Sequence, residues 1–187
     1  MKKIFIALRL FFILTLLTGI VYPLFVTGAS QLFFKSKSEG SLVFQNGKVL
    51  GSTWIGQNFK DEKYFWSRPS AVDYNPLPSG GSNLAPTSAI LLEKMEERKK
   101  NLKEGLEKIP EDLLFSSGSG LDPHISPEAA VYQIQRIQRV RAMNSVQDSQ
   151  IKSLIDAMTE PRSFGIIGEK RVNVLSLNLE LDKLTKE

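Results

Sequence analysis

The sequence contains no cysteine and only one histidine, His124. The absence of cysteine excludes disulfide bonds, thiol catalysis and metal sites built from thiolates, so an apolar core must hold the fold together. Any metal site would need carboxylates for most of its ligands, because one histidine supplies only one. A lone histidine is more often a hydrogen-bonded structural residue, and that is what we expect of His124.

The common nucleotide-binding motifs are also missing. No G-x-x-x-x-G-K-[ST] phosphate loop occurs, and neither does the D-K-T-G-T stretch that carries the phosphorylated aspartate of P-type ATPases. Gly118-Ser119-Gly120 begins like a dinucleotide-binding fingerprint, but Pro123 stands where the third glycine belongs. The sequence therefore does not predict the motor of an ion pump, and it assigns no residue to a bound cofactor.

One loop gathers residue types that hydrolases use. Asp122 and His124 follow closely after three serines, which are Ser116, Ser117 and Ser119. A nucleophile elbow requires G-x-S-x-G, and Ser117 occupies the place of the first glycine before Ser119. A membrane-anchored hydrolase stays an alternative at this point, as does a ligand-binding module, but we expect no catalytic residue here.

Charge is absent from residues 10–34, a run of 25 residues. A helix of this length extends roughly 37 Å, which is enough to cross a hydrocarbon core of about 30 Å. We predict a single transmembrane helix there, in which Gly19, Pro23 and Gly28 are candidates for packing against other helices. The rival reading is a cleaved signal peptide with its site at residues 27–29, but apolar residues continue through Phe34.

The charges that flank the run predict its orientation. The basic residues are Lys2, Lys3 and Arg9 before it, and Lys35 and Lys37 after it. Since Glu39 partly offsets the second group, the positive-inside bias places residues 1–9 in the cytoplasm and residues 35–187 outside it. The expected location is the cell (inner) membrane, with a single pass.

The outer part of the chain carries no net charge. Residues 1–35 hold four basic residues and no acidic one, which leaves 20 basic and 20 acidic residues in 36–187. A neutral domain has no electrostatic case for binding nucleic acid. About 150 residues are ample for one domain with its own core.

Apolar patterns in the outer part predict a mixed α/β (α+β) domain. A tight hairpin is expected around Asn46-Gly47, and strand alternation is read over 171–181. Between them lie irregular loops at 68–86 and 116–127, which are rich in glycine, proline and serine.

Three helices are predicted from caps and apolar spacing. The first follows Thr87 or Ser88, with apolar positions at Leu91, Met95, Leu102, Leu106 and Ile109. The second follows Ser126-Pro127, with a stripe of Ala130, Ile134 and Ile137 and an exposed side of Gln133, Gln135, Arg136, Gln138, Arg139 and Arg141. The third is capped by Asp148 or Ser149, ends before Pro161, and has apolar positions at Ile151, Leu154, Ile155 and Met158.

Five segments occur in a family-specific order. They are GSTWIGQNF (51–59), YFWSRPSAVDYN (64–75), SGGSNL (79–84), SGSGLDPHISPEAA (117–130) and GEKRVNVLSLNLELD (168–182). Together with one N-terminal anchor, they closely resemble the C subunit of the Kdp-type potassium-transporting ATPase (the KdpC family). Two departures are small: Ala85-Pro86 stands where Gly-Pro is common, and Lys170 stands where many relatives have proline.

The resemblance implies a non-motor subunit of an ATP-driven potassium importer. The implied partners are a channel-like subunit that binds potassium, a P-type ATPase subunit and a very small membrane peptide. ATP, K⁺ and Mg²⁺ would be handled by these partners. The family's C subunit is held to stabilise the complex and is proposed to be a catalytic chaperone that raises the affinity of the ATPase subunit for ATP.

Under this reading a set of polar loop residues is expected to order the loops or to dock against partners. The candidates are Gln57, Arg68, Ser82, Asn83, Asp122, His124 and Arg171. Loops shaped by turn chemistry display backbone groups and single charged side chains, which suits contact with another protein.

Overall fold

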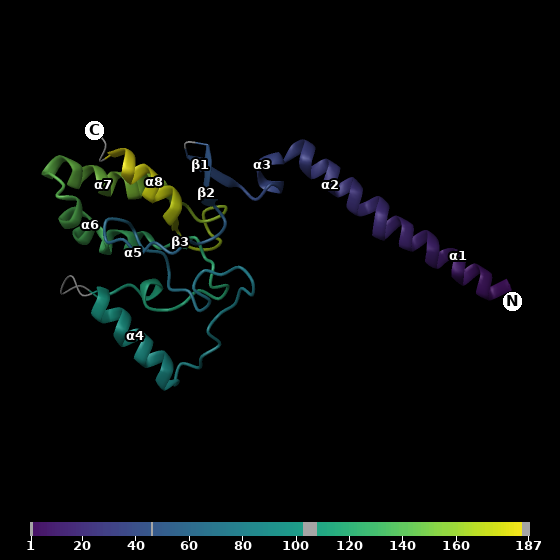
Figure 1. Cartoon of the computed structure of the whole chain (residues 1–187), viewed down its shortest axis with the longest axis horizontal. Coiled ribbons are helices and arrows are strands. Elements are labelled where there is room, and N and C mark those ends of the chain that lie inside the picture. Colours follow the sequence, from purple (N-terminus) through teal and green to yellow (C-terminus); the bar gives the residue numbers. More distant parts are fainter. Residues whose placement is uncertain (1, 46, 103–107, 185–187) are drawn as a thin grey trace. The chain divides into compact units, whose positions relative to one another are not determined.

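The computed structural model describes residues 2–45, 47–102 and 108–184. The chain divides into two compact units, an N-terminal unit (Met1–Leu42) and a C-terminal unit (Val43–Glu187). The fold class agrees with the prediction, because an apolar N-terminal helix precedes a unit of helices and small antiparallel sheets (Figure 1).

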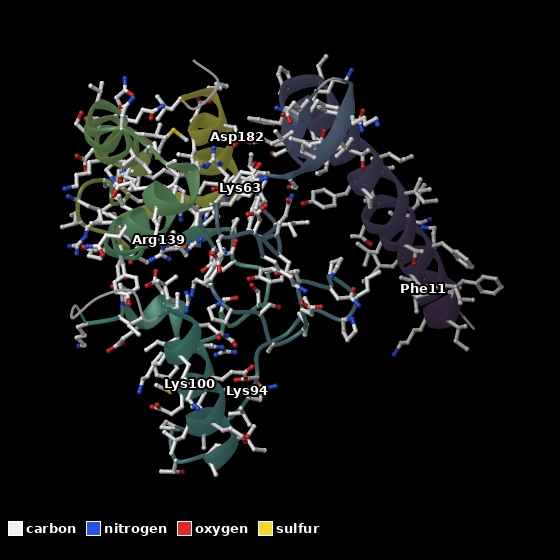
Figure 2. All side chains as sticks on the ribbon, turned by 60° about the vertical axis from the view of Figure 1, so that its left-hand side comes forward. Phe11, Lys63, Lys94, Lys100, Arg139 and Asp182 are labelled. Carbon is white, nitrogen blue, oxygen red and sulfur yellow. The ribbon has the colours of Figure 1, made fainter. Side chains whose placement is uncertain are left out.

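The N-terminal unit is one long apolar helix followed by a short one. Its segments are α1 (Lys2–Leu16), the π-helical turn η1 (Leu17–Val21), α2 (Tyr22–Phe33) and α3 (Lys35–Ser38). Within Lys2–Phe33 an 18-residue window has a mean hydropathy of 2.5, and none of that window is buried. Phe11, labelled in Figure 2, is 62% exposed. By length and composition it is the one helix in the described residues that can cross a membrane.

Pro23 explains the wide turn in this helix. Proline has no N–H to donate, so the regular hydrogen-bond ladder cannot continue through it. The N–H of Tyr22 instead bonds the carbonyl of Leu17, five residues back. The hydroxyl of Thr27 donates to the Pro23 carbonyl at 2.8 Å. The helix thus passes the proline without ending, as a membrane segment requires.

The chain also forms two small sheets. The first is a hairpin of β1 (Leu42–Gln45) and β2 (Lys48–Ser52), and the second has the order β3 (His124–Ile125), β5 (Arg171–Asn173), β4 (Thr159–Glu160). In the first, Gly47 has a φ of 76°, as the predicted tight turn needs, whereas Asn46 lies outside the described residues. In the second, all pairing is antiparallel, with His124 opposite Asn173.

The helices of the C-terminal unit are α4 (Ala89–Leu102), η2 (Glu111–Leu113), α5 (Pro127–Tyr132), α6 (Ile134–Arg141), α7 (Ser145–Met158) and α8 (Val174–Leu184). The predicted cap at Ser126 is confirmed, since its hydroxyl accepts the N–H of Ala129 at 3.0 Å. The predicted cap of α7 is wrong. Asn144 caps this helix instead, in a capping box with Gln147. Leu106, predicted for the first helix, lies outside the described residues.

The strand predicted over 171–181 is also corrected. β5 ends at Asn173 and α8 begins at Val174. The Asn173 side chain accepts the N–H of Ser176 at 3.0 Å, which starts the helix. The buried positions Val174, Leu177 and Leu181 have helical spacing, and the odd-numbered leucines only resembled strand alternation.

Helices α5–α8 lie close together in the C-terminal unit (Figure 1). The core includes buried side chains from these helices, from β3, β5 and η2, and from the extended segment around Phe65. Its side chains are 2% exposed or less at Phe65, Ile125, Ile137, Ile151, Ile155, Val172, Leu177 and Leu181. Burial of each such side chain contributes about 1.5–3 kcal/mol. This apolar core stabilises the fold of a chain that, without cysteine, cannot form disulfide bonds.

Candidate functional site

Arg68, Asp122 and His124 form one cluster between the two irregular loops. The Arg68 guanidinium lies 3.1 Å from one Asp122 oxygen, and the other oxygen accepts the His124 backbone N–H at 3.0 Å. The His124 ring nitrogen Nδ1 is 3.6 Å from that second oxygen. Both carboxylate oxygens are therefore engaged by neighbours within the fold.

Electrostatics keep Asp122 ionised. Burial by itself raises the pKa of this carboxyl, but the hydrogen bonds from His124 and the charge of Arg68 outweigh burial. The pKa of Asp122 consequently lies below its usual value. A carboxylate in this state is an acceptor and an ion-pair partner, not a proton donor at neutral pH.

The backbone at Arg68 is itself held in place. The Tyr74 hydroxyl donates to the Arg68 carbonyl at 2.7 Å, and burial raises the pKa of Tyr74 to about 12. The Arg68 Nε is buried and has no hydrogen-bond partner among the described residues. Arg68 therefore depends on Asp122 to satisfy its charge.

The two loops approach each other backbone to backbone. The N–H of Gly80 bonds the Ser119 carbonyl at 2.9 Å, and that of Ser117 bonds the Pro69 carbonyl at 3.2 Å. A Cβ on Gly120, whose φ is 70°, would lie 2.7 Å from the Gly80 carbonyl oxygen. Glycine at 120 thus permits the close contact, while Gly80 and Gly118 have open space around them.

A pocket of about 450 Å³ opens beside this cluster. Arg68, Asp122, His124 and Arg171 all line it, so the structure brings four of the seven predicted residues to one place. The remaining charged lining residues are Glu111, Asp112, Glu169 and Lys170. The lining thus carries charges of both signs, which favours a polar partner surface over a ligand of one charge.

The other three predicted residues lie elsewhere. Gln57 lines a second pocket of about 180 Å³, where its amide donates to the Leu50 carbonyl at 3.2 Å. Asn83 has a φ of 52° in the loop, and neither it nor Ser82 lines the larger pocket. Gln57 therefore braces the hairpin strand β2, and the geometry gives Ser82 and Asn83 no shared site with Arg68.

The serines of the second loop make local contacts. The hydroxyl of Ser119 accepts the N–H of Leu121 at 3.1 Å, and that of Ser116 accepts from Arg98 at 3.3 Å. In residues 108–184 no hydrogen bond joins these hydroxyls to the His124 ring. The described residues also contain no cluster of three or more metal-ligating side chains. This geometry does not favour a serine hydrolase.

Two buried amides, Gln133 and Asn178, hold the segment that leads into the site. Gln133 was expected on an exposed helix face but is 2% exposed. Its side chain accepts the Trp66 N–H at 2.7 Å and donates to the Trp66 carbonyl at 3.3 Å. Asn178 makes the same pair of bonds with Phe65, at 2.8 and 3.0 Å. Each amide thus satisfies the backbone N–H and carbonyl of one residue, as a neighbouring strand would. The two residues, 65 and 66, lie just before Arg68 in the chain.

Arg136 was likewise expected at the surface and is 4% exposed. It donates to Gln133 at 2.7 Å and to the Glu62 carbonyl, and its guanidinium lies 3.8 Å from the Trp66 ring centre. The sequence did contain a signal for the burial of Gln133, because this residue lies one turn before Ile137 on the apolar stripe of the helix. Helical periodicity therefore predicts that Gln133 is buried, whereas its polarity suggested an exposed position.

Comparisons with known proteins agree with one another. The family model described as "KdpC: K+-transporting ATPase, c chain" matches residues 4–183. A potassium-transporting ATPase KdpC subunit of Polaromonas naphthalenivorans is 49% identical over 185 residues, covering 95% of this chain and 93% of the relative. One from Geotalea uraniireducens is 46% identical over 192 residues, covering both chains completely. The chain belongs to the KdpC family, the c chains of K⁺-transporting ATPases.

Proposed function

We propose that this chain is the non-motor accessory subunit of an ATP-driven potassium importer and that it stabilises the assembled complex. The full-length relatives named as potassium-transporting ATPase KdpC subunits support the proposal. The observation that carries it is the Arg68–Asp122–His124 cluster. These side chains bind one another and the backbone, so they order two loops into a fixed surface.

The proposed partners are those of a Kdp-type importer. They are a channel-like potassium-binding subunit, a P-type ATPase subunit and a small membrane peptide. Residues 1–9 would lie in the cytoplasm, 10–34 in the cell (inner) membrane and 35–187 outside, as the flanking charges predict. ATP, Mg²⁺ and K⁺ would be bound by the partners.

A catalytic-chaperone effect on ATP affinity must be indirect in this topology. The C-terminal unit and the ATP site would lie on opposite sides of the membrane. Coupling then requires two states of the complex that this subunit binds unequally. Gly19, Pro23 and Gly28 are the proposed contact positions within the membrane, because small residues allow helices to approach closely.

Purification with this chain as bait in mild detergent tests the proposal. We expect a large polytopic channel-like protein and a P-type ATPase to be recovered with it. Recovery of the chain alone would contradict the proposal. The same purification of a variant with alanine at Arg68, Asn83, Asp122 and His124 tests the site.

That variant should lower the yield of the complex and its potassium-stimulated ATPase activity. The matched control replaces four exposed charged residues of α4 by alanine, namely Glu93, Lys94, Glu97 and Lys100. Two of them, Lys94 and Lys100, are labelled on this helix in Figure 2. Equal yields and activities for both variants would show that the four site residues do not serve assembly.

A further inference from the structure

Large apolar side chains are exposed at the start of the C-terminal unit, on the hairpin β1–β2 and on the turn that follows it. Phe44 is 63% exposed, Val49 53% and Trp54 57%. We call these three residues the hairpin group. Exposed apolar residues are common on protein surfaces, so exposure alone assigns no partner to the hairpin group. Its orientation, its position in the chain and the charge around it do.

Strand alternation turns two members of the hairpin group away from the body of the unit. Successive side chains of a strand point to opposite faces. Gln45 of β1 and Leu50 of β2 line the pocket of about 180 Å³ that residues of α8 also line. Phe44 precedes Gln45, and Val49 precedes Leu50. Phe44 and Val49 therefore lie on the outer face of the hairpin.

Covalent geometry limits how far the hairpin can lie from the membrane segment. Val43, the first residue of the C-terminal unit, follows Phe34, the last residue of the uncharged run, by nine positions. A fully extended chain of that length spans at most about 30 Å, and the helix α3 within it shortens this reach. The hairpin therefore begins within this distance of the outer end of the membrane segment.

The chain around the hairpin differs in charge from the rest of the unit. Residues 35–60 hold four basic residues and one acidic residue, which gives a net charge of +3. Residues 61–187 hold 17 basic and 19 acidic residues, which gives a net charge of −2. Lys48 lies in the hairpin itself, next to Val49. Exposed apolar side chains within a cationic segment suit an anionic lipid surface.

The residue types favour lipid over protein as the occupant. Aromatic residues are common at both kinds of surface. Lysine is depleted at protein–protein interfaces but favoured at the edge of a bilayer, where its charged end extends to the headgroups. A second copy of this chain would bring the same cationic segment against itself, and like charges oppose such pairing.

The turn that carries Trp54 is joined to the candidate site. The Gly56 N–H donates to the Leu121 carbonyl at 2.7 Å. A Cβ on Gly56 would lie 2.6 Å from the backbone carbonyl oxygen of Asp122, so glycine permits this close contact. A surface that holds the hairpin group consequently also orients the loop of Asp122.

We propose that the hairpin group binds the headgroup region of the bilayer that holds the apolar helix, with anionic phospholipid as its ligand. The three apolar side chains enter this region, and Lys48 pairs with lipid phosphates. The contact sets the orientation of the candidate site relative to the membrane. This inference rests on the membrane anchor of the proposed function but not on the partner subunits, so it applies to the chain alone.

Fluorescence quenching from the lipid side tests the contact. The chain has no cysteine, so Phe44→Cys introduces a single thiol that can carry an NBD dye. The full chain is reconstituted in vesicles of phosphatidylcholine and phosphatidylglycerol that include a lipid with a nitroxide on its headgroup. The matched control is Val146→Cys on α7, because Val146 and Phe44 are both 63% exposed. We expect quenching at position 44 to be at least about threefold stronger than at position 146.

Val49→Cys repeats the measurement from the neighbouring strand, so a folding defect at one position does not decide the result. Quenching at both hairpin positions that is no stronger than at position 146 would overturn the inference. The same measurement in the purified complex should retain the quenching. Its loss there would mean that a partner subunit covers the hairpin group, and dye self-quenching that is relieved by unlabelled chain would mean that a second copy does. Either result would also overturn the inference.

Lipid composition provides a second readout. Quenching at position 44 should rise as phosphatidylglycerol replaces phosphatidylcholine, because anionic headgroups attract the cationic segment. Lys48→Gln should reduce this rise by about a third, since it removes one of three net charges. Lys152→Gln, at an exposed position of α7, is the control and should leave the rise unchanged. Quenching that does not depend on phosphatidylglycerol would exclude anionic phospholipid as the ligand.

The outcome is separable from that of the proposed function. A chain that purifies without partners would contradict the proposed function, yet the vesicle measurement would still decide whether the hairpin group binds lipid. A complex recovered intact with no quenching at the hairpin would contradict this inference alone.

Discussion

Asp122 is the single residue on which the site depends most. It accepts from Arg68 at 3.1 Å and from the His124 N–H at 3.0 Å. Replacing it with asparagine keeps the shape but removes the charge that balances Arg68. We expect Asp122→Asn to lower the free energy of unfolding by about 1–3 kcal/mol, because a half-buried guanidinium loses its counter-ion. Urea unfolding of the full chain in detergent measures this.

The control for this variant is Glu180→Gln. Glu180 pairs with Lys183 at 2.6 Å on α8; the Lys183 side chain is exposed and that of Glu180 is partly exposed. Exposed ion pairs contribute little, so this substitution should change stability by less than about 0.5 kcal/mol. Equal effects of the two substitutions would mean that the cluster is no more important than an ordinary surface pair.

Because the pKa of Asp122 is lowered in the folded state, the sign of its effect on the pH dependence of folding stability is known. A carboxyl whose pKa is lower in the folded state stabilises the fold above its unfolded pKa, which is about 3.9. That contribution disappears as pH falls through the lower folded value. The stability difference between wild type and Asp122→Asn should therefore be constant at neutral pH and shrink below about pH 4. A difference that grows on acidification, measured by urea unfolding, would contradict this assignment.

At the residue scale, the sequence indicated which side chains have suitable chemistry for a site, but not which of them lie close together. Arg68, Asp122 and His124 stood out because each is a charged or titratable residue in a loop of turn formers, and the fold brings them together. Ser82 and Asn83 are polar residues of the same kind of loop, yet they lie outside the pocket. Loop composition identifies residues that form turns, but it contains no information about which loops meet.

Elements were predictable where apolar spacing and a cap agreed. The helix after Ser126 shows this, since both signals start it at the same point. The segment after Asn173 shows the opposite, because leucine alternation predicted a strand, whereas the folded chain forms a helix that the Asn173 side chain caps. Tertiary burial decided between them. Local sequence patterns could not decide between strand and helix, since a period of two and a helical period share several positions over a short segment.

The buried amide of Gln133 joins α5 and α6 to the segment that leads into the site. Gln133→Leu removes the partners of the Trp66 N–H and carbonyl and of Arg136. We expect a loss of about 2–4 kcal/mol in unfolding free energy, because buried polar groups are left without hydrogen bonds. Urea unfolding measures the loss, and hydrogen exchange at the Trp66 amide should accelerate.

Gln135→Leu is the matched control, with the same change two residues away at an exposed position of α6. It should leave both stability and the Trp66 exchange rate close to wild type. If the two leucine variants behaved alike, the amide at Gln133 would not be holding this segment.

For the whole molecule, charge and composition were the most informative features of the sequence. The positive net charge belongs to residues 1–35, and the remainder is balanced at 20 basic and 20 acidic residues. The uncharged run of residues 10–34 predicted a membrane anchor, and this distribution predicted a neutral outer domain. The apolar helix Lys2–Phe33 agrees with the predicted anchor. Interfaces with partners could not be read from the sequence, because they depend on surfaces that only the folded chain assembles.

The orientation of the chain is the prediction that belongs to this scale. Because the chain lacks cysteine, Lys3→Cys and Val146→Cys each introduce one thiol, on either side of the apolar helix. The excess of basic residues before the helix predicts that residue 3 stays in the cytoplasm and that residue 146 is outside. In cells with a permeabilised outer envelope, a membrane-impermeant maleimide should therefore label Val146→Cys and spare Lys3→Cys until the inner membrane is opened. The parent chain should never be labelled. Labelling of Lys3→Cys alone before that step would reverse the topology, and it would then allow the C-terminal unit to reach ATP directly.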